Sequence, residues 1–179
     1  MQLAVFVAGP PGAGKSSLAR IVARHLRAAL IDSDALYGPL TPHLSAADPQ
    51  LVREALYDGL VETVAMVTSV GVPAVVVAPF TRERADASAW ERIRTRARAA
   101  GAQAVLVWVH APVEVLLERL AERGLERDAA KLSDPVSWLD QARPEVPPAV
   151  AHLAVDGTLP VQAAAEALLA ELAALGLRS

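Results

Sequence analysis

Residues 3–18 read LAVFVAGPPGAGKSSL, an apolar run followed by a glycine-rich loop that ends in lysine and serine. The loop is a complete G-x-x-x-x-G-K-S pattern, and it lies between a predicted buried strand and the start of a predicted helix. Its glycines allow successive backbone N–H groups to turn inward, where they and the helix N-terminus attract phosphate oxygens. We therefore expect a nucleotide-binding site at this loop. Its expected residues are Gly9, Pro10, Pro11, Gly12, Ala13, Gly14, Lys15, Ser16 and Ser17.

Two side chains of the loop have expected roles toward the nucleotide. Lys15 would bridge the β- and γ-phosphates, and the Ser16 hydroxyl would bind Mg²⁺. In a chain of this composition, such a pattern arises by chance about once in two thousand sequences. An ordinary glycine-rich turn is therefore the weaker alternative.

Beyond this loop, apolar strands continue to alternate with helices. Predicted strands cover residues 3–8, 29–31, 74–78, 104–109 and 152–155, and predicted helices cover residues 15–26, 49–70, 85–100 and 160–175, with another opened by Pro112. Three of the strands are uninterrupted apolar runs, which is typical of strands buried on both faces of a parallel sheet. We predict an α/β fold: a three-layer sandwich with a mostly parallel five-stranded sheet, formed by one domain over residues 1–179.

Composition excludes several classes of protein. Apolar residues make up 53% of the chain and charged residues 21%, which is typical of a folded globular protein. Cysteine is absent, which excludes disulfides and thiolate metal sites, and the four histidines show no paired ligand spacing. The formal net charge of −3 provides no overall attraction to a polyanion. We therefore expect neither nucleic acid nor a membrane surface as a partner.

The apolar stretches do not indicate membrane spans. No positive charge precedes the first one, and a glycine-rich loop follows it instead of a signal-peptide cleavage site. Residues 60–80 carry a single charge, but Gly71 and Pro73 interrupt them, so a helix end, a turn and a buried strand explain them better. We expect a cytoplasmic protein, and we leave the oligomeric state open, with a homodimer as one alternative.

Two carboxylates follow the second predicted strand. Alternation along an extended chain places Asp32 and Asp34 on the same side. One would hold Mg²⁺ through water, and the other would accept the proton of an attacking hydroxyl. The alternative is a turn in which these residues only cap the following segment. Because the third predicted strand ends in Ala78-Pro79-Phe80 without an acid, we expect the metal-supporting acid from the second strand.

The order strand, G-x-x-x-x-G-K-S, helix and D-x-D resembles the small P-loop kinases that phosphorylate hydroxyl groups, such as the shikimate, gluconate and chloramphenicol kinases and the zeta-toxin group. The two motifs carry the resemblance, and the element order extends it over nearly the whole chain. It implies a nucleoside-monophosphate-kinase-like P-loop fold that binds ATP and Mg²⁺, with Asp34 as the base and Asp32 as the magnesium-side acid. Chloramphenicol phosphotransferases use a single aspartate near this position, so the assignment of the two acids stays open. Residues 78–80 replace the glycine pair of shikimate kinases, which argues against shikimate as the acceptor.

A charged segment between two predicted helices, residues 123–131, lies where such kinases keep a lid. We expect a mobile lid over approximately residues 123–134, formed by an exposed loop. Arg123 and Arg127 are expected to stabilise the transferring phosphoryl group, because planar guanidinium groups donate to two oxygens at once. Arg119 follows the same four-residue spacing, and solvated surface is an equal alternative for it.

The remaining assignments concern the acceptor and the base of the nucleotide. The acceptor is expected to bind to approximately residues 34–70, where Tyr37 would line its pocket. Arg82 and Arg84 are expected to face the acceptor, because they follow the carboxyl end of the third strand. Asp156 directly follows the last strand, at the position from which these kinases approach the adenine ring, and a plain turn is an equal alternative.

These assignments predict an ATP-dependent phosphotransferase that moves the γ-phosphoryl group to a hydroxyl group of a small molecule. Its expected catalytic residues are Asp34, Lys15, Arg123 and Arg127. One alternative is a nucleotide-dependent switch or regulatory ATP-binding module, in which hydrolysis is slow. Another is a kinase of nucleotide sugars or polynucleotide ends, although polynucleotide binding calls for a basic groove that the net charge does not indicate. No motif identifies the acceptor or distinguishes ATP from GTP.

Overall fold

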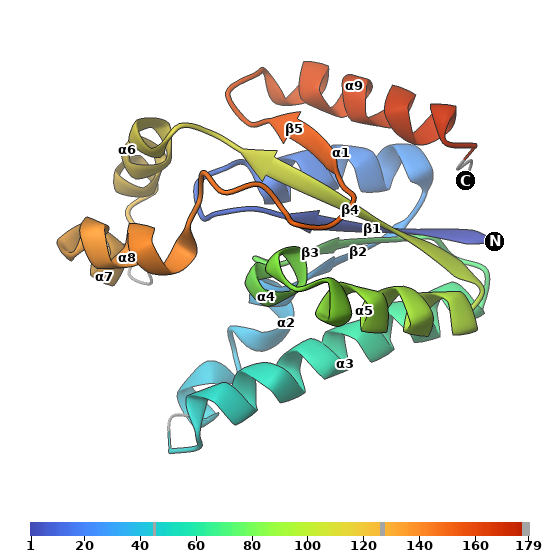
Figure 1. The fold of residues 1–179 in the computed structure, drawn as a ribbon, viewed down its shortest axis with the longest axis horizontal. Helices are drawn as coiled ribbons and strands as arrows, with labels where there is room; N and C mark the ends of the chain where they lie inside the picture. The colour runs from blue at the N-terminus through green and yellow to red at the C-terminus, as the bar shows by residue number, and fades with distance from the viewer. Residues whose placement is uncertain (45, 126–127, 177–179) are drawn as a thin grey trace.

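The computed structural model describes residues 1–44, 46–125 and 128–176. Within these residues, five parallel strands form one sheet in the order β2-β3-β1-β4-β5, with helices on both faces (Figure 1). The strands are β1 (Gln2–Ala8), β2 (Ala29–Asp32), β3 (Ala74–Val77), β4 (Ala102–His110) and β5 (Leu153–Asp156). The predicted α/β fold with a parallel five-stranded sheet is confirmed.

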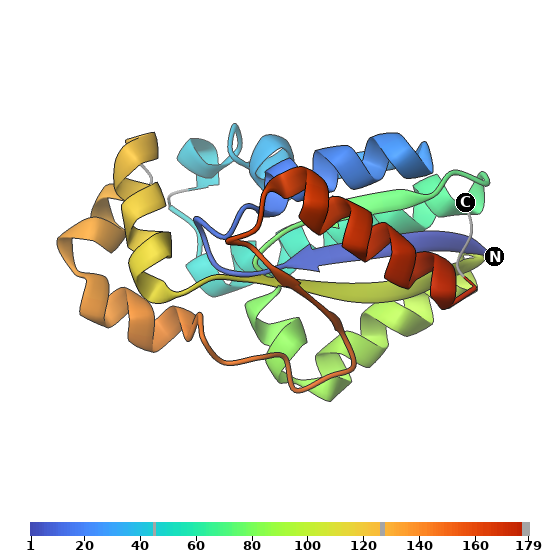
Figure 2. The same cartoon turned by 90° about the horizontal axis from the view of Figure 1, so that it is seen from above.

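Helices α1 and α9 cover one face of the sheet, and α3 and α5 cover the other (Figure 2). The helices are α1 (Lys15–Leu26), α2 (Ser33–Tyr37), α3 (Pro49–Ser69), α4 (Thr81–Ala85), α5 (Ala87–Ala99), α6 (Val113–Arg123), α7 (Ala129–Ser133), α8 (Pro135–Ala142) and α9 (Val161–Ala174), with a 3-10 turn at Thr41–Leu44. In the described part of the chain, no helix combines the length and the apolar character that a bilayer crossing requires.

The central strand β1 shows why the sheet is buried on both faces. Its side chains alternate, so Leu3 and Val5 join the core beneath α1 and α9, while Ala4 and Phe6 join the core beneath α3 and α5. Water is excluded from both sides of the strand, which explains its uninterrupted apolar sequence.

The long helices α1 and α3 begin where the sequence predicts. The α1 helix covers the predicted residues 15–26, and α3 begins after Asp48, whose carboxylate accepts from the N–H groups of Gln50 and Leu51 at 2.8 and 3.3 Å. The short helices α2 and α4 are not predicted. Each has five residues, too few for helical periodicity to become visible in the sequence.

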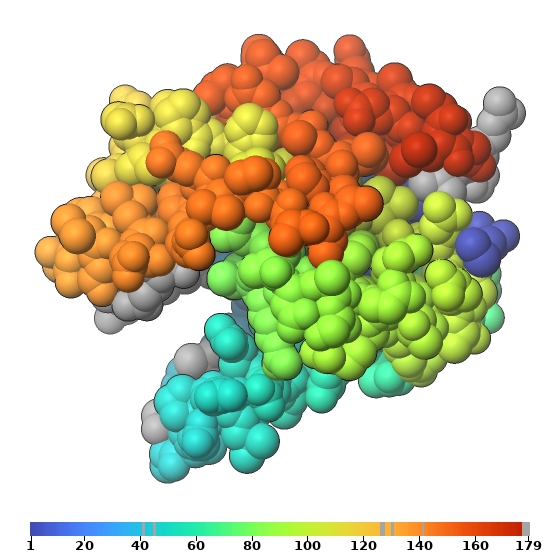
Figure 3. All heavy atoms as spheres, viewed as in Figure 1, coloured from blue at the N-terminus to red at the C-terminus, as the bar shows by residue number. Residues whose placement is uncertain are grey.

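The site lies at the carboxyl ends of the strands, where ligands bind in open α/β sheets. The glycine-rich loop, α2, α4 and α6 all follow strands at this edge. From α6 the chain continues into α7 and α8, which project beyond the sheet (Figures 1 and 2). Opposite them lie α2 and the start of α3, and the space-filling view shows a hollow between the two groups (Figure 3).

Candidate active site

The glycine-rich loop leaves an open space in front of α1. Gly14 caps the helix with a φ of +94°, a conformation that favours glycine, and a Cβ added there would meet no atom within 4 Å. Lys15 is the first residue of the helix, and its Nζ donates to the carbonyl oxygen of Pro10 at 2.8 Å. The loop thus presents a helix N-terminus and an ammonium group, an arrangement that suits an anion.

Ser16, Asp32 and Asp34 lie together beside the loop. The Ser16 hydroxyl donates to Asp32 Oδ2 at 3.1 Å. Asp32 Oδ1 accepts from the backbone N–H of Asp34 at 3.0 Å and thereby caps α2. The extended conformation expected for residues 32–34 is therefore wrong, because this cap turns the chain into a helix. Asp32 thus caps the following segment, as the alternative interpretation of these residues expects. Its other carboxylate oxygen contacts Ser16.

These side chains line a cavity of about 370 Å³, which we call the P-loop cavity. It is bounded by the glycine-rich loop, the start of α2, the end of β3 and the segment from α6 to α7. Its lining residues are Pro11, Gly12, Gly14, Lys15, Ser16, Ser17, Asp32, Ser33, Asp34, Val77, Ala78, Pro79, Arg119, Arg123, Asp128 and Lys131. The cavity therefore brings together the predicted phosphate loop, both acids and one of the two predicted lid arginines.

The segment predicted as a lid contains a short helix and a buried carboxylate where the sequence predicts an exposed loop. Helix α7 occupies residues 129–133, and the side chain of Asp128 is 0% exposed. Arg123 Nε and Lys131 Nζ each donate to a carboxylate oxygen of Asp128 at 2.6 Å. Burial raises the pKa of Asp128, but the hydrogen bonds from Lys131 and Arg123 outweigh burial, so this pKa lies below its ordinary value. Arg127 lies outside the described residues.

A second cavity of about 330 Å³ adjoins the first, and we call it the apolar cavity. The two cavities share Gly12, Gly14, Ser17 and Arg119. The rest of the lining, which is mostly apolar, consists of Ala13, Leu18, Val109, Val155, Gly157, Leu159, Val161 and Ala164. Arg119 Nη1 donates to the carbonyl oxygens of Gly157 and Gly12 at 2.8 and 3.3 Å. This arginine therefore ties the loop after β5 to the glycine-rich loop.

Gly157 lines the apolar cavity, whereas Asp156 is engaged in its own turn. Asp156 Oδ1 accepts from the N–H and the hydroxyl of Thr158 at 2.8 and 2.6 Å, and these hydrogen bonds lower the pKa of Asp156. A Cβ on Gly157 would lie 2.4 Å from the carbonyl oxygen of Ala13, so only glycine fits between the two loops. The predicted set of site residues omits Gly157 and Arg119, although a glycine after the last strand and the regular arginine spacing are visible in the sequence.

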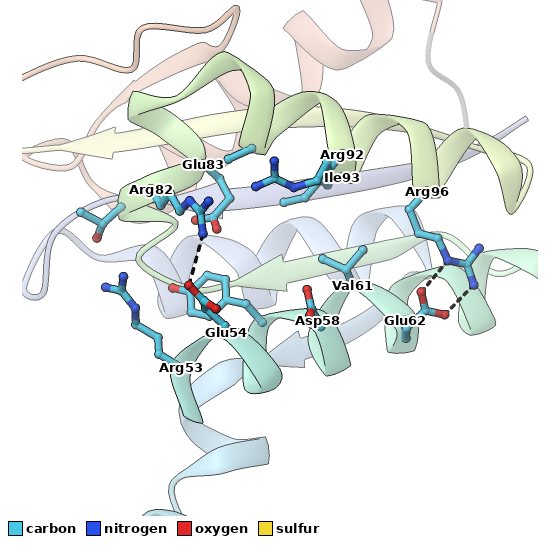
Figure 4. A pocket seen from close by; sticks show the side chains of 13 residues that line it. Arg53, Glu54, Asp58, Val61, Glu62, Arg82, Glu83, Arg92, Ile93 and Arg96 are labelled. Atoms are coloured by element: carbon cyan, nitrogen blue, oxygen red, sulfur yellow. Dashed lines mark hydrogen bonds and ion pairs between the residues drawn. The ribbon is translucent and has the colours of Figure 1, made fainter. Parts of the chain in front are cut away.

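A third cavity, of about 540 Å³, lies between α3 on one side and α4 and α5 on the other (Figure 4). We call it the helix cleft. Among the described residues, none lines both this cleft and the P-loop cavity: Pro79 lines the P-loop cavity, and Thr81, two positions further along the chain, lines the cleft. The lining residues are Arg53, Glu54, Tyr57, Asp58, Val61, Glu62, Thr81, Arg82, Glu83, Ala89, Arg92, Ile93 and Arg96.

Two ion pairs cross the helix cleft. Arg82 Nη1 lies 3.6 Å from Glu54 Oε1. Farther along the cleft, Arg96 donates from Nε and Nη2 to the two oxygens of Glu62 at 2.6 and 2.5 Å (Figure 4). Each pair joins α3 to the opposite wall, so the cleft is bridged at two points by side chains of opposite charge.

Tyr57 and Glu83 are half-buried polar residues of the cleft. The Tyr57 hydroxyl accepts from the N–H of Phe80 at 3.3 Å, and Phe80 has a φ of +46°, which is strained for a residue with a side chain. Burial raises the pKa of Tyr57 and of Glu83. Glu83 is absent from the predicted site, because in sequence it is only an acid between two arginines.

The structure separates the three residues expected at the acceptor. Arg82 lines the helix cleft. Tyr37 is half-buried against α3, where its hydroxyl would lie 3.3 Å from a Cβ added to Gly59. Arg84 is buried and faces the end of α8 and the segment that follows it instead of the cleft. Its guanidinium donates at 2.6, 3.2 and 2.6 Å to the carbonyl oxygens of Ala142, Arg143 and Val146.

Comparisons with known proteins agree with this architecture. Residues 5–143 match the AAA domain family, and no curated protein matches the chain. The fold is similar to that of an unliganded sugar kinase from Janibacter sp. HTCC2649, with a TM-score of 0.73, 18% identity and coverage of 100% of this chain and 99% of that chain. It is also similar to a gluconokinase from Sinorhizobium meliloti 1021, with a TM-score of 0.66, 22% identity and coverage of 97% and 93%.

An APS kinase from Mycobacterium tuberculosis, solved in complex with AMPPNP and APS, has a TM-score of 0.68, 21% identity and coverage of 96% of this chain and 97% of that chain. At these identities the likeness concerns the fold. Together, the family match and the folds confirm the resemblance to small P-loop kinases that the two amino-terminal motifs indicate.

Proposed function

From the premise that this chain belongs to the AAA domain family, we propose that it transfers the γ-phosphoryl group of ATP to a hydroxyl group of a small molecule. The observation that carries the proposal is that the P-loop cavity shares lining residues with an apolar cavity, while a charged cleft is lined by the chain that follows β3, whose end lines the P-loop cavity. The apolar cavity suits a nucleotide base, and the charged helix cleft suits a polar acceptor. A phosphoryl donor and an acceptor can therefore meet at the residues between them.

ATP fits the two cavities around the glycine-rich loop. Its phosphates would lie in the P-loop cavity, where Gly14 leaves open space and Lys15 supplies positive charge. Side chains such as Leu18 and Val155 would bury the flat base in the apolar cavity. The AMPPNP complex of the similar APS kinase supports this choice of nucleotide.

The donor set beside the loop suits Mg²⁺. Ser16 Oγ and Asp32 Oδ2 lie 3.1 Å apart, and both are oxygen donors of the kind that Mg²⁺ prefers. Bound there, Mg²⁺ would neutralise charge on the phosphate oxygens. Because Asp32 also caps α2, it fixes the backbone of Asp34. Asp32 would thus serve the metal side, and Asp34, which lines the same cavity, would serve proton transfer.

Asp34 is the base in this proposal. It is an exposed residue at the start of α2 and lines the P-loop cavity. Its carboxylate would accept the hydroxyl proton as the acceptor oxygen bonds to the γ-phosphorus and the bond to the β-phosphate oxygen breaks, releasing ADP. Lys15 and Arg123 would stabilise the charge of the transferring group. Arg127 keeps the same proposed role.

The lining of the helix cleft favours a polar, hydroxyl-bearing acceptor. It includes four arginines and four acidic residues, so it offers hydrogen-bond donors and acceptors in balance. A polynucleotide end would call for a basic groove, which this balance does not provide. A nucleotide-dependent switch needs no third hollow beside its phosphates. The cleft therefore favours a small-molecule kinase over the switch and over a kinase of polynucleotide ends, with Arg82 at the acceptor.

Acceptor-dependent ADP formation tests the proposed function. With Mg·ATP, the protein should form ADP faster in the presence of a hydroxylated small molecule from a broad panel than in water alone. Lys15→Ala should weaken ATP binding and abolish transfer in a folded protein, because this lysine serves the phosphates and not the core. The control is Arg24→Ala, which removes an exposed cation near the other end of α1.

Two outcomes would contradict the proposal. A folded Lys15→Ala variant with the affinity and turnover of the parent would remove the P-loop assignment. Tight ATP binding without acceptor-dependent ADP formation across the whole panel would favour the nucleotide-dependent switch.

A further inference from the structure

Asp128 is a charged residue whose side chain is completely buried. It lies between α6 and α7, and its exposed fraction is 0%. Arg123 Nε and Nη2 both reach Oδ2, at 2.6 and 2.5 Å, and Lys131 Nζ donates to Oδ1 at 2.6 Å. Both oxygens of one carboxylate therefore hold cations, one from each helix.

The charges of this cluster depend on one another. Burying a carboxylate is costly unless it is paired and hydrogen-bonded, and Asp128 has two charged donors. In turn, Arg123 and Lys131 can lie close together only because a negative charge separates them. At neutral pH the three side chains form a unit with one net positive charge.

This unit is part of the wall of the P-loop cavity. Arg123, Asp128 and Lys131 line that cavity together with Lys15 and Asp34. The side chains of Arg123 and Lys131 remain 34% and 25% exposed, so part of each can still be reached by a ligand. Long cationic side chains lose rotamer freedom when they are fixed, which opposes binding. A partner that fixes them beforehand removes that cost from phosphate binding.

We propose that Asp128 is a positioning residue, which holds Arg123 and Lys131 together so that both cations meet the transferring phosphoryl group as one unit. The inference rests on the proposed function, because it takes the P-loop cavity to be the phosphate site. It also assigns a role to Lys131, a lid residue outside the predicted catalytic set.

The same contacts would have the opposite effect if Asp128 acted as a competing counter-ion. It would then occupy the two cations until phosphates displaced it, and its removal would strengthen phosphate binding. When the Asp128 carboxylate is removed, positioning predicts weaker phosphate binding and competition predicts stronger phosphate binding, so one substitution distinguishes them.

Binding of inorganic tripolyphosphate measures that sign without any acceptor. Calorimetric titration should show affinity about tenfold or more weaker in Asp128→Asn than in the parent, because two charge-assisted donors lose their common anchor. The control Asp140→Asn makes the same chemical change at an exposed residue of α8 and should bind like the parent. Equal or tighter binding by a folded Asp128→Asn variant would overturn the proposal.

The titration also separates this inference from the proposed function. If Lys15→Ala loses tripolyphosphate affinity and Asp128→Asn does not, the phosphate site stands and the positioning role falls. If the parent itself does not bind tripolyphosphate, the phosphate site falls and the positioning role falls with it.

A set of combined variants tests whether Asp128 acts through its two cations. Turnover of Asp128→Asn should fall about a hundredfold, a loss typical of misplaced catalytic groups. The double variant Arg123→Met, Lys131→Met should lose at least as much. Adding Asp128→Asn to that double variant should cost nothing more, because the groups that it positions are already absent. A further loss in the triple variant would show that Asp128 only maintains the lid's structure, and would overturn the proposal.

Discussion

The proposed nucleotide side, around the glycine-rich loop, and the proposed acceptor side, in the helix cleft, are built from different parts of the chain. On the nucleotide side the backbone makes the decisive contacts: Gly14 leaves open space before α1, and Gly157 approaches the carbonyl oxygen of Ala13. In the helix cleft, long charged side chains such as Arg82 and Glu54 form the walls. A backbone-built site suits the constant part of a ligand, whereas a side-chain-built cleft can change its specificity without changing the fold.

The largest expected effect is a loss of ATP affinity from a substitution on the nucleotide side alone. In Gly157→Ala, the new methyl group would lie 2.4 Å from the Ala13 carbonyl oxygen and 2.9 Å from that of His110. Because neither backbone atom can move freely, we expect ATP affinity to fall about a hundredfold, as titrated by calorimetry. Gly59→Ala is the matched control on the acceptor side, where the new methyl group would meet only the Tyr37 hydroxyl at 3.3 Å. Equal ATP affinities of the two variants would contradict the comparison.

The next prediction compares the free energies of unfolding of variants at two arginines that lie two positions apart on α4. Arg84→Met should lower the free energy of unfolding by about 2–3 kcal/mol, because it removes a buried guanidinium group that donates to three carbonyl oxygens. Arg82→Met should lower it by less than about 0.5 kcal/mol, since its ion pair is exposed. Urea denaturation measures both. Similar losses would mean that the helix cleft is a structural element and not a variable binding surface.

A smaller effect concerns Glu83 in the helix cleft. Burial raises its pKa in the folded protein, so the folded state binds the proton more tightly than the unfolded chain does. The stabilisation is therefore present at acidic pH and is lost as the pH rises through the folded pKa. Glu83→Gln should raise the free energy of unfolding at pH 7 by less than about 1 kcal/mol and flatten its pH dependence above the ordinary glutamate range.

The exposed Glu171→Gln serves as the control for this titration. Its free energy of unfolding should follow the parent at every pH. If the free energy of unfolding of Glu83→Gln also followed that of the parent at every pH, Glu83 would be as well solvated as a surface residue, and burial would not raise its pKa.

The sequence predicts the nucleotide side better than the acceptor side for a physical reason. Phosphate binding requires glycine, lysine and serine at fixed spacing. Residues 9–16 have this spacing, so they predict the loop together with the strand before it and the helix after it. The acceptor side depends on α2 and α4, whose five residues each show no periodicity. Without the position of α4, nothing in the sequence distinguishes Arg82 in the cleft from Arg84 in the interior.

The lid illustrates a second limit of sequence patterns. Residues 123–131 are rich in charge, a composition that indicates solvated loops. Asp128 is nevertheless buried, because Arg123 and Lys131 satisfy its carboxylate from two directions. The i,i+3 spacing of Asp128 and Lys131 is compatible with a pair on one helix, but no spacing shows that Arg123 of α6 meets the same carboxylate or that the carboxylate is buried.

The division of labour between Asp32 and Asp34 is the central claim, and magnesium titrations of turnover test it most directly. Asn caps helices as well as Asp does, so Asp32→Asn should keep α2 and the backbone of Asp34 in place. We expect Asp34→Asn to retain ATP affinity and the parent's magnesium requirement while its turnover falls about a hundredfold or more. Asp32→Asn should instead raise the magnesium concentration for half-maximal turnover by about tenfold. Identical magnesium curves, or a shifted magnesium requirement in Asp34→Asn instead, would contradict the assignment.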